Sequence, residues 1–232
     1  MYARWKKDNQ GRRYTAGSKK FAKLNTLVIE KYYSHDLVMS EDILIVALTG
    51  MPGAGKTTVA NYLSQKGIPL LIMGDVVREA AQNDGLEPTS DNLAKLMIRL
   101  RGKNGPEAIA HLIVNKIRIM KKENKKFGVV IVDGIRSMAE VQVLKRVGNV
   151  KLLAIHGSTL TRYSHVKERA RSDVPSNISE FDKRDRVEME VGISNAIALA
   201  DETISNNDIS ISELCERSFL TVQKWIQENG TR

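Results

Sequence analysis

The glycine-rich segment at residues 50–58 carries the residue types and spacing that most clearly predict chemistry. It reads GMPGAGKTT and matches the phosphate-binding pattern G-x-x-x-x-G-K-[ST]. Glycines let the backbone curl so that successive N–H groups point inward and form an anion-binding nest. The Lys56 ammonium can reach the β- and γ-phosphates, and the Thr57 hydroxyl can ligate Mg²⁺. We therefore expect this loop to bind a nucleoside triphosphate. The residues expected to contact it are Gly50, Gly53, Ala54, Gly55, Lys56, Thr57 and Thr58.

Asp133 is the second residue expected to act on the phosphates. It directly follows the apolar run at residues 129–132, and this arrangement is typical of a Walker-B-type strand. Such a strand brings a carboxylate close to Mg²⁺ and its waters. Thr57 and Asp133 are therefore the expected metal ligands, and Mg²⁺ together with ATP, as co-substrate, is the expected cofactor set.

The segments on either side of the loop are those that a phosphate-binding loop requires. Residues 43–48 are an unbroken apolar run, which is typical of a strand buried on both faces of a parallel sheet. Residues 58–66 are expected to form a helix with one apolar face, and Gly67 is placed to end it. The positive N-terminal end of this helix would face the phosphates.

Alternating strands and helices continue along the chain. The expected further strands are residues 68–73, 129–133, 150–155 and 203–205. The expected further helices are residues 75–84, a helix capped by Thr89 or Ser90 and broken at Gly102, a long helix from Pro106, a helix after the Ser137 capping box, residues 161–170, residues 181–200 and a closing helix after Ser210. This order predicts an α/β fold of the P-loop NTPase class, with a five-stranded parallel sheet and helices on both faces.

Charge divides the chain into two parts. The 232 residues carry a net charge of +9, and residues 1–40 hold nine Lys/Arg against three Asp/Glu. We expect a basic, flexible, solvated N-terminal extension at residues 1–39 and a P-loop domain at residues 40–232. The alternative for the extension is a nucleic-acid-binding arm, because aromatic residues stand among its Lys and Arg. Met39 is a second candidate, beside Met1, for the natural start.

Composition excludes several classes of protein. No apolar run reaches the roughly 18 residues of a membrane span, and the N-terminus has no apolar signal core. Cys215 is the single cysteine, which excludes an internal disulfide framework and a multi-cysteine zinc site. We expect a cytoplasmic protein with no membrane partner, and the sequence does not indicate an oligomeric state.

Three short motifs extend the pattern that begins with the loop. Residues 74–78 read GDVVR, residues 133–136 read DGIR, and Arg162, Arg169 and residues 171–173 (RSD) follow. In this series the chain resembles the nucleoside monophosphate kinases, above all the adenylate-kinase-related P-loop proteins of archaea. That family has a G-D-x-x-R acceptor element, a D-G-x-P-R element and an arginine-rich lid. In this chain the second element is one residue shorter, because the proline is missing.

The resemblance implies an acceptor-binding helical insert and a short arginine-bearing lid. It also implies transfer of the γ-phosphate of a Mg²⁺–nucleoside triphosphate to a nucleoside monophosphate of the AMP type. Such a transfer depends on positioning and on electrostatic stabilisation by Mg²⁺, Lys and Arg. The implied acceptor-binding residues are Gly74, Asp75, Arg78, Arg136 and Glu140. The implied catalytic residues are Lys56, Asp133, Arg136, Arg162, Arg169 and Arg171.

Glu140 has two interpretations. It is the far half of a capping box that begins at Ser137, and this is the favoured interpretation. It also stands one helical turn after Arg136, where adenylate kinases carry a glutamine that contacts adenine. A glutamate at that place would accept hydrogen bonds from a base but would donate none.

Two alternatives to a monophosphate kinase stay open. Residues 200–206 read ADETISN and resemble the A-D-x-x-I-x-N motif of dephospho-CoA kinases, which phosphorylate a ribose hydroxyl. The three-residue step from Asp75 to Arg78 is the spacing of the monophosphate kinases, so that family ranks first. The other alternative is a poorly catalytic nucleotide-binding regulatory protein whose basic extension binds nucleic acid.

Overall fold

The computed structural model describes residues 5–7, 13–15, 43–124, 127–168 and 177–230. By its internal contacts the chain divides into residues 1–37 and 38–232, which are described separately. In the first unit, β1 (Trp5–Lys7) pairs antiparallel with β2 (Arg13–Thr15) to form a small hairpin. The expectation that the extension is flexible and solvated falls largely outside the described residues and stays a prediction.

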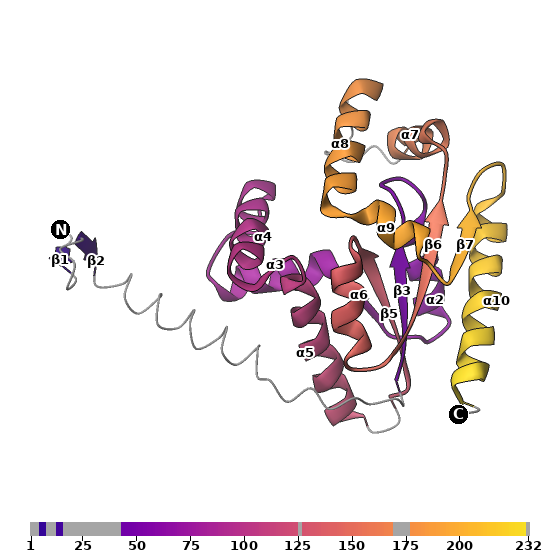
Figure 1. Ribbon diagram of the computed structural model, residues 1–232, viewed down its shortest axis with the longest axis horizontal. Helices are drawn as coiled ribbons and strands as arrows, with labels where there is room; N and C mark the ends of the chain where they lie inside the picture. Colours follow the sequence, from indigo (N-terminus) through magenta and orange to yellow (C-terminus); the bar gives the residue numbers. More distant parts are fainter. Residues whose placement is uncertain (1–4, 8–12, 16–42, 125–126, 169–176, 231–232) are drawn as a thin grey trace. The chain divides into compact units, whose positions relative to one another are not determined.

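Five parallel strands form the sheet of the second unit (Figure 1). In spatial order they are β4 (Leu70–Ile72), β5 (Val129–Ile135), β3 (Leu44–Thr49), β6 (Asn149–His156) and β7 (Glu202–Ser205). Every neighbouring pair is parallel, so the carboxyl ends of all five strands meet at one edge. The predicted five-stranded parallel sheet of the P-loop NTPase class is confirmed.

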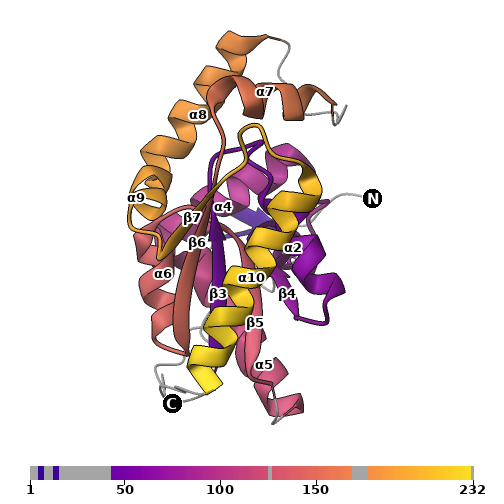
Figure 2. The same ribbon diagram turned by 90° about the vertical axis from the view of Figure 1, so that its right-hand side faces the viewer.

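Helices cover both faces of this sheet, as predicted (Figure 2). On one face lie α2 (Lys56–Gln65) and α10 (Ile211–Gly230), which contact each other and β3. On the other face lie α5 (Ala108–Glu123), α6 (Met138–Lys145) and α9 (Ile193–Ala198). The central strand β3 is buried along its whole length, because helices pack on both of its faces.

A helical insert separates β4 from β5. It contains α3 (Met73–Asn83) and α4 (Ser90–Asn104), which contact each other and α5. The expected strand at residues 68–73 is shorter in the structure, because Met73 begins α3 and buries itself on the same helical face as Val76 and Val77. Gly102, the expected break, lies inside α4, which continues to Asn104.

The segment after β6 differs from the expectation of one long helix at residues 181–200. The structure has α7 (Thr159–Glu168) and, beyond the undescribed residues 169–176, α8 (Ile178–Val191) followed by α9. Gly192 separates α8 from α9, because its φ of +109° is left-handed and cannot continue a right-handed helix. Among the described residues, no helix is long and apolar enough to cross a membrane.

Candidate active site

The phosphate-binding loop joins the carboxyl end of β3 to the first residue of α2. Its glycines pack closely against the surrounding elements. A Cβ at Gly53 would stand 2.6 Å from the Arg162 carbonyl oxygen, and one at Gly55 would stand 2.8 Å from Asn206 Nδ2. Both glycines also have positive φ, +81° and +107°. The loop is therefore held in shape from outside, by α7 and by the segment after β7.

The ammonium group of Lys56 lies against the first two residues of the loop. Its Nζ donates to the carbonyl oxygens of Gly50, at 2.6 Å, and Met51, at 3.1 Å. Burial lowers the pKa of Lys56 to about 8, although the nearby Asp133 carboxylate acts in the opposite direction. A bound phosphate would offer this ammonium a charged partner in place of two neutral carbonyl groups.

Asp133 and Thr57 meet beside the loop. Thr57 Oγ1 lies 3.5 Å from Asp133 Oδ2, while the buried Oδ1 accepts no hydrogen bond from any described residue. Burial raises the pKa of the Asp133 carboxyl, and the Lys56 ammonium partly opposes that rise. A hydroxyl and a carboxylate with an uncommitted oxygen fit Mg²⁺, which prefers oxygen ligands and completes its shell with phosphates and waters. The described residues contain no cluster of three or more His, Cys, Asp or Glu that could hold a metal by itself.

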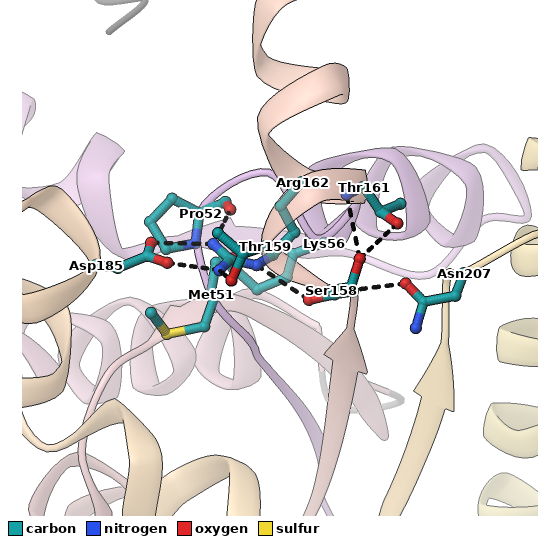
Figure 3. A network of polar contacts seen from close by, with 10 residues as sticks. Met51, Pro52, Lys56, Ser158, Thr159, Thr161, Arg162, Asp185 and Asn207 are labelled. Carbon is teal, nitrogen blue, oxygen red and sulfur yellow. Dashed lines mark hydrogen bonds and ion pairs between the residues drawn. The ribbon is translucent and has the colours of Figure 1, made fainter. Parts of the chain in front are cut away.

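Arg162, from α7, ties the loop to α8 (Figure 3). Its Nη1 donates to the Pro52 carbonyl oxygen, at 3.0 Å, and to Asp185 Oδ1, at 2.9 Å. Its Nη2 donates to Asp185 Oδ2, and its Nε donates to the Gly157 carbonyl oxygen at 3.0 Å. The expected role for Arg162 is a mobile lid charge, but this guanidinium is buried and committed to these four acceptors and to Thr159 Oγ1.

The expected acceptor elements adjoin each other at the same edge of the sheet. A Cβ at Gly134 would stand 3.3 Å from Met73 Cβ, so the end of β5 touches the first turn of α3. Gly74 lies in that turn. Asp75 and Arg78 form an ion pair with each other, and their side chains are 59% and 54% exposed. The two acceptor motifs are therefore neighbours in space.

Arg136 follows β5 and pairs with a residue that sequence reasoning did not select. Its Nε lies 3.3 Å from Oε2 of Glu188, on α8. Lys56 interacts electrostatically with Asp133, Glu188 and Arg136, so these four groups share one electrostatic environment. Sequence reasoning missed Glu188 because nothing in the local pattern of α8 distinguishes it from a solvated glutamate.

Glu140 completes the capping box, so the favoured interpretation is confirmed. Its Oε2 accepts from the backbone N–H groups of Arg136, at 2.7 Å, and Ser137, at 3.3 Å, while its own N–H donates to Ser137 Oγ. The carboxylate is buried, and burial raises its pKa. This position commits Glu140 to the start of α6, and we assign it no contact with a base.

Asn206 is a second residue with an unexpected role. Its buried Nδ2 donates to the Ala54 carbonyl oxygen of the loop at 2.9 Å, and its backbone N–H donates to the His156 carbonyl oxygen. Earlier in the same motif, Asp201 Oδ2 accepts from Leu152 N–H at 2.7 Å. The motif at residues 200–206 therefore joins β7 to β6 and anchors the phosphate loop.

The last expected site residues follow α7, a helix that itself contacts the loop. Arg169 and Arg171 lie outside the described residues, so their expected lid role stays a prediction. His165, on α7, brings its Nδ1 to 3.2 Å from the Gly53 carbonyl oxygen. The α7 helix therefore contacts the loop through both His165 and Arg162.

Comparisons with known proteins show a family and a similar fold. Residues 49–182 match the AAA domain family. The UPF0200 protein of Thermococcus onnurineus is 40% identical over 167 residues, which are 71% of this chain and 89% of that protein. A UPF0200 protein of Pyrococcus abyssi is 40% identical over 168 residues, with 71% and 88% coverage. The crystal structure of TT1252 from Thermus thermophilus is similar in fold, with a TM-score of 0.54, 21% identity, and coverage of 78% of this chain and 97% of that one.

Proposed function

The chain belongs to the UPF0200 family and carries an AAA domain, and we propose that it is a P-loop phosphotransferase acting on nucleotides. In this proposal the enzyme moves the γ-phosphoryl group of Mg²⁺–ATP to a nucleoside monophosphate of the AMP type. The observation that carries the proposal is that the phosphate loop, the end of β5 with Arg136 beyond it, and the start of α3 meet at one edge of the sheet.

The donor half uses the loop, Lys56, Thr57 and Asp133. Backbone N–H groups of the loop and the N-terminus of α2 would hold the phosphates. When bound, Mg²⁺ would offset charge on the β- and γ-phosphates, held by Thr57 Oγ1 and Asp133. The Lys56 ammonium would exchange the carbonyls of Gly50 and Met51 for a phosphate oxygen. These groups position the triphosphate and stabilise charge, which is most of what phosphoryl transfer requires.

The acceptor half uses Arg78 and Arg136. Arginine suits an acceptor phosphate, because its planar guanidinium can hold two phosphate oxygens in parallel bonds. The exposed pair of Arg78 with Asp75 contributes at most about 1 kcal/mol, so an incoming phosphate can displace it at little cost. Gly74 and Asp75 would support this site as the first turn of α3.

The closing charges are proposed to come from Arg169 and Arg171. They stand in the sequence between α7 and α8, two helices that Arg162 joins to the loop. Arginines arriving on such a segment would exclude water from the donor phosphate and stabilise the transferring group. Arg162 itself would act on this step by holding the two helices. In this proposal residues 40–232 form the kinase domain, and residues 1–39 are an extension.

The dephospho-CoA kinase alternative ranks second for a physical reason. The motif that carries that resemblance, residues 200–206, has a role in the fold itself, because Asn206 anchors the loop and Asp201 joins two strands. That role requires no ribose acceptor. A regulatory, poorly catalytic nucleotide-binding protein ranks third.

A panel of acceptors tests the proposal. Purified full-length protein is supplied with Mg²⁺ and ATP, and ADP formation is measured with no acceptor, with each of AMP, GMP, CMP and UMP, and with dephospho-CoA. We expect ADP formation to depend on a monophosphate and the corresponding diphosphate to appear. Turnover with dephospho-CoA alone would favour the second alternative. The same slow ADP formation with and without every acceptor would favour the third.

A further inference from the structure

Two carboxylates on α8 each hold an arginine of the candidate site. Asp185 pairs with Arg162, and Glu188, three residues later on the same helical face, pairs with Arg136. The two arginines come from distant places in the chain: Arg162 from α7 and Arg136 from the turn after β5. The single helix α8 thus contacts both the donor and the acceptor sides of the site.

The Asp185 pair is a structural anchor. The side chains of Arg162 and Asp185 are only 4% and 10% exposed, and the guanidinium also binds the loop through the Pro52 carbonyl. Its Cζ lies 5.0 Å from the centre of the Phe181 ring, which also belongs to α8. These contacts hold α8 against the phosphate loop.

The Glu188 pair is different, because its carboxylate is largely covered while its arginine is not. Glu188 is 13% exposed, whereas Arg136 is 41% exposed. The buried Oε2 lies at ion-pair distance from Arg136 Nε but accepts no hydrogen bond from any described residue. A guanidinium held at Nε still has its Nη donors to offer to an anion. The half-exposed arginine can therefore keep its carboxylate partner and bind a phosphate at the same time.

The backbone at the end of α8 keeps this pair together. A Cβ at Gly192 would stand 3.7 Å from Ser137 Cβ and 3.9 Å from the Arg136 carbonyl oxygen. The end of α8 therefore packs directly on the turn that carries Arg136. This contact holds the last turn of α8, which carries Glu188, close to the backbone of Arg136.

We propose that Glu188 is a positioning residue, which orients the Arg136 guanidinium toward the phosphate of the nucleotide acceptor. The inference rests on the proposed function, since it assigns a role within the same acceptor site. Glu188 acts through Arg136 and touches no reacting atom. Because Asp185 anchors the same helix to the loop, the acceptor arginine is aligned with the site of the triphosphate.

The first test compares Glu188→Gln with Glu190→Gln, a matched control that removes the same charge from an exposed position of the same helix. AMP affinity is measured by calorimetry on the full chain with ADP bound in the loop. We expect Glu188→Gln to weaken AMP binding about tenfold and ADP binding far less, with the protein still folded by its thermal melting curve. Glu190→Gln should change none of these. An AMP affinity of Glu188→Gln equal to that of the control would overturn the inference.

A double-mutant cycle tests whether Glu188 acts through Arg136. In the Arg136→Ala background, we expect Glu188→Gln to have no further effect on AMP affinity. A full tenfold loss in that background would show that Glu188 acts on the acceptor independently, and the positioning role would be wrong.

An NMR measurement separates this inference from the proposed function. The Arg136 Nε–H signal, assigned by its loss in Arg136→Lys, is compared among the wild type, Glu188→Gln and Glu190→Gln. Inorganic phosphate is then titrated into the ADP-bound proteins. We expect Glu188→Gln alone to shift the signal and to weaken its response to phosphate. If the wild type binds no monophosphate, the proposed function fails. The NMR experiment still tests the contact between Glu188 and Arg136. An Arg136 Nε–H signal that Glu188→Gln leaves unchanged would show that Glu188 does not orient Arg136.

Discussion

Lys56 and Asp133 of the candidate site have side chains whose charged forms are disfavoured by burial. Burial lowers the pKa of Lys56 from 10.5 to about 8 and raises that of Asp133. Between about pH 8 and pH 10.5, Lys56 binds more protons in the unfolded chain than in the folded protein. The free energy of unfolding therefore rises with pH over that range. At neutral pH both charged side chains therefore reduce stability. A triphosphate with Mg²⁺ would supply opposite charge to each of them.

We predict that Lys56→Ala abolishes most turnover but leaves the protein folded. Removing the ammonium takes away charge aimed at the transferring phosphate, and the rate should fall by about a hundredfold or more. The thermal midpoint should stay the same or rise, because a buried charge has been removed. Steady-state kinetics and a melting curve of the same preparation measure both effects. Near-normal turnover would contradict the assignment of the loop.

We also predict that ATP binding weakens as the pH rises above about 8. Bound phosphates raise the Lys56 pKa, so above its free value of about 8 the protein must take up a proton to bind. Affinity should then fall by up to about tenfold per pH unit until the pKa of the complex is reached. Calorimetry from about pH 7 to pH 9.5 measures this slope. Lys56→Arg, which stays protonated, is the control, and an equal slope in that variant would exclude Lys56 as its source.

Among the larger elements, the phosphate loop depends on two neighbours that come much later in the chain. Asn206, after β7, holds the Ala54 carbonyl, and α7 holds the carbonyls of Pro52 and Gly53. The loop's own glycines make it adaptable, so its shape is set by these contacts. Residues that never touch a nucleotide are thereby expected to control nucleotide affinity.

We predict that Asn206→Ala weakens both the fold and ATP binding. The change leaves a buried carbonyl oxygen without its partner and should lower the free energy of unfolding by about 1–3 kcal/mol. Denaturant unfolding and ATP calorimetry measure the two effects. Asn195→Ala, at an exposed position of α9, is the control and should change neither. If ATP affinity is unchanged in Asn206→Ala, the loop does not need this anchor.

A pair of glycine variants tests the break between α8 and α9. Gly192→Ala should destabilise the protein by about 1–2 kcal/mol, because an alanine is strained at a φ of +109°. Gly102→Ala, inside α4 where an added Cβ would meet no atom within 4 Å, should stabilise it by about 0.5–1 kcal/mol. Urea denaturation of both variants provides the measurement. A Gly192→Ala variant as stable as the wild type would mean that the left-handed turn at Gly192 can be replaced without cost.

For the whole molecule, the division after Leu37 separates a hairpin-containing unit from the unit that carries the candidate site. We predict that a shortened chain beginning at Met39 keeps its thermal midpoint within about 2 °C, which corresponds to less than about 1 kcal/mol. ATP affinity should also be kept. Melting curves and calorimetry of both chains provide the comparison. A lower midpoint would show that the extension packs on the P-loop unit.

The same two chains test the nucleic-acid alternative. We expect fluorescently labelled single-stranded DNA and RNA to bind both chains equally weakly at low salt. Binding confined to the full chain, and lost as salt is added, would contradict the expectation of a solvated extension and support a nucleic-acid-binding arm.

The sequence by itself determined the features whose causes are local. The buried strand, the glycine loop and the following helix are adjacent in the chain, so the residue pattern at 43–66 was enough to predict them. The capping box of Ser137 and Glu140 is equally local, because its two halves are three residues apart. The number of strands and their parallel direction followed from the alternation of strands and helices.

Only the tertiary structure decided which groups those features meet. Asn206 reaches Ala54 across 152 residues of sequence, and Arg162 meets Asp185 across 23. Both arginine and glutamate are ordinary on a solvated helix face, so the pairing of Arg136 with Glu188 has no local signature. The parallel sheet brings these partners together, because it places the carboxyl ends of distant strands at one edge. The left-handed turn at Gly192 ends α8 and sets its direction relative to α9. The loop can therefore be predicted from the sequence, while the residues that hold and align it depend on the fold.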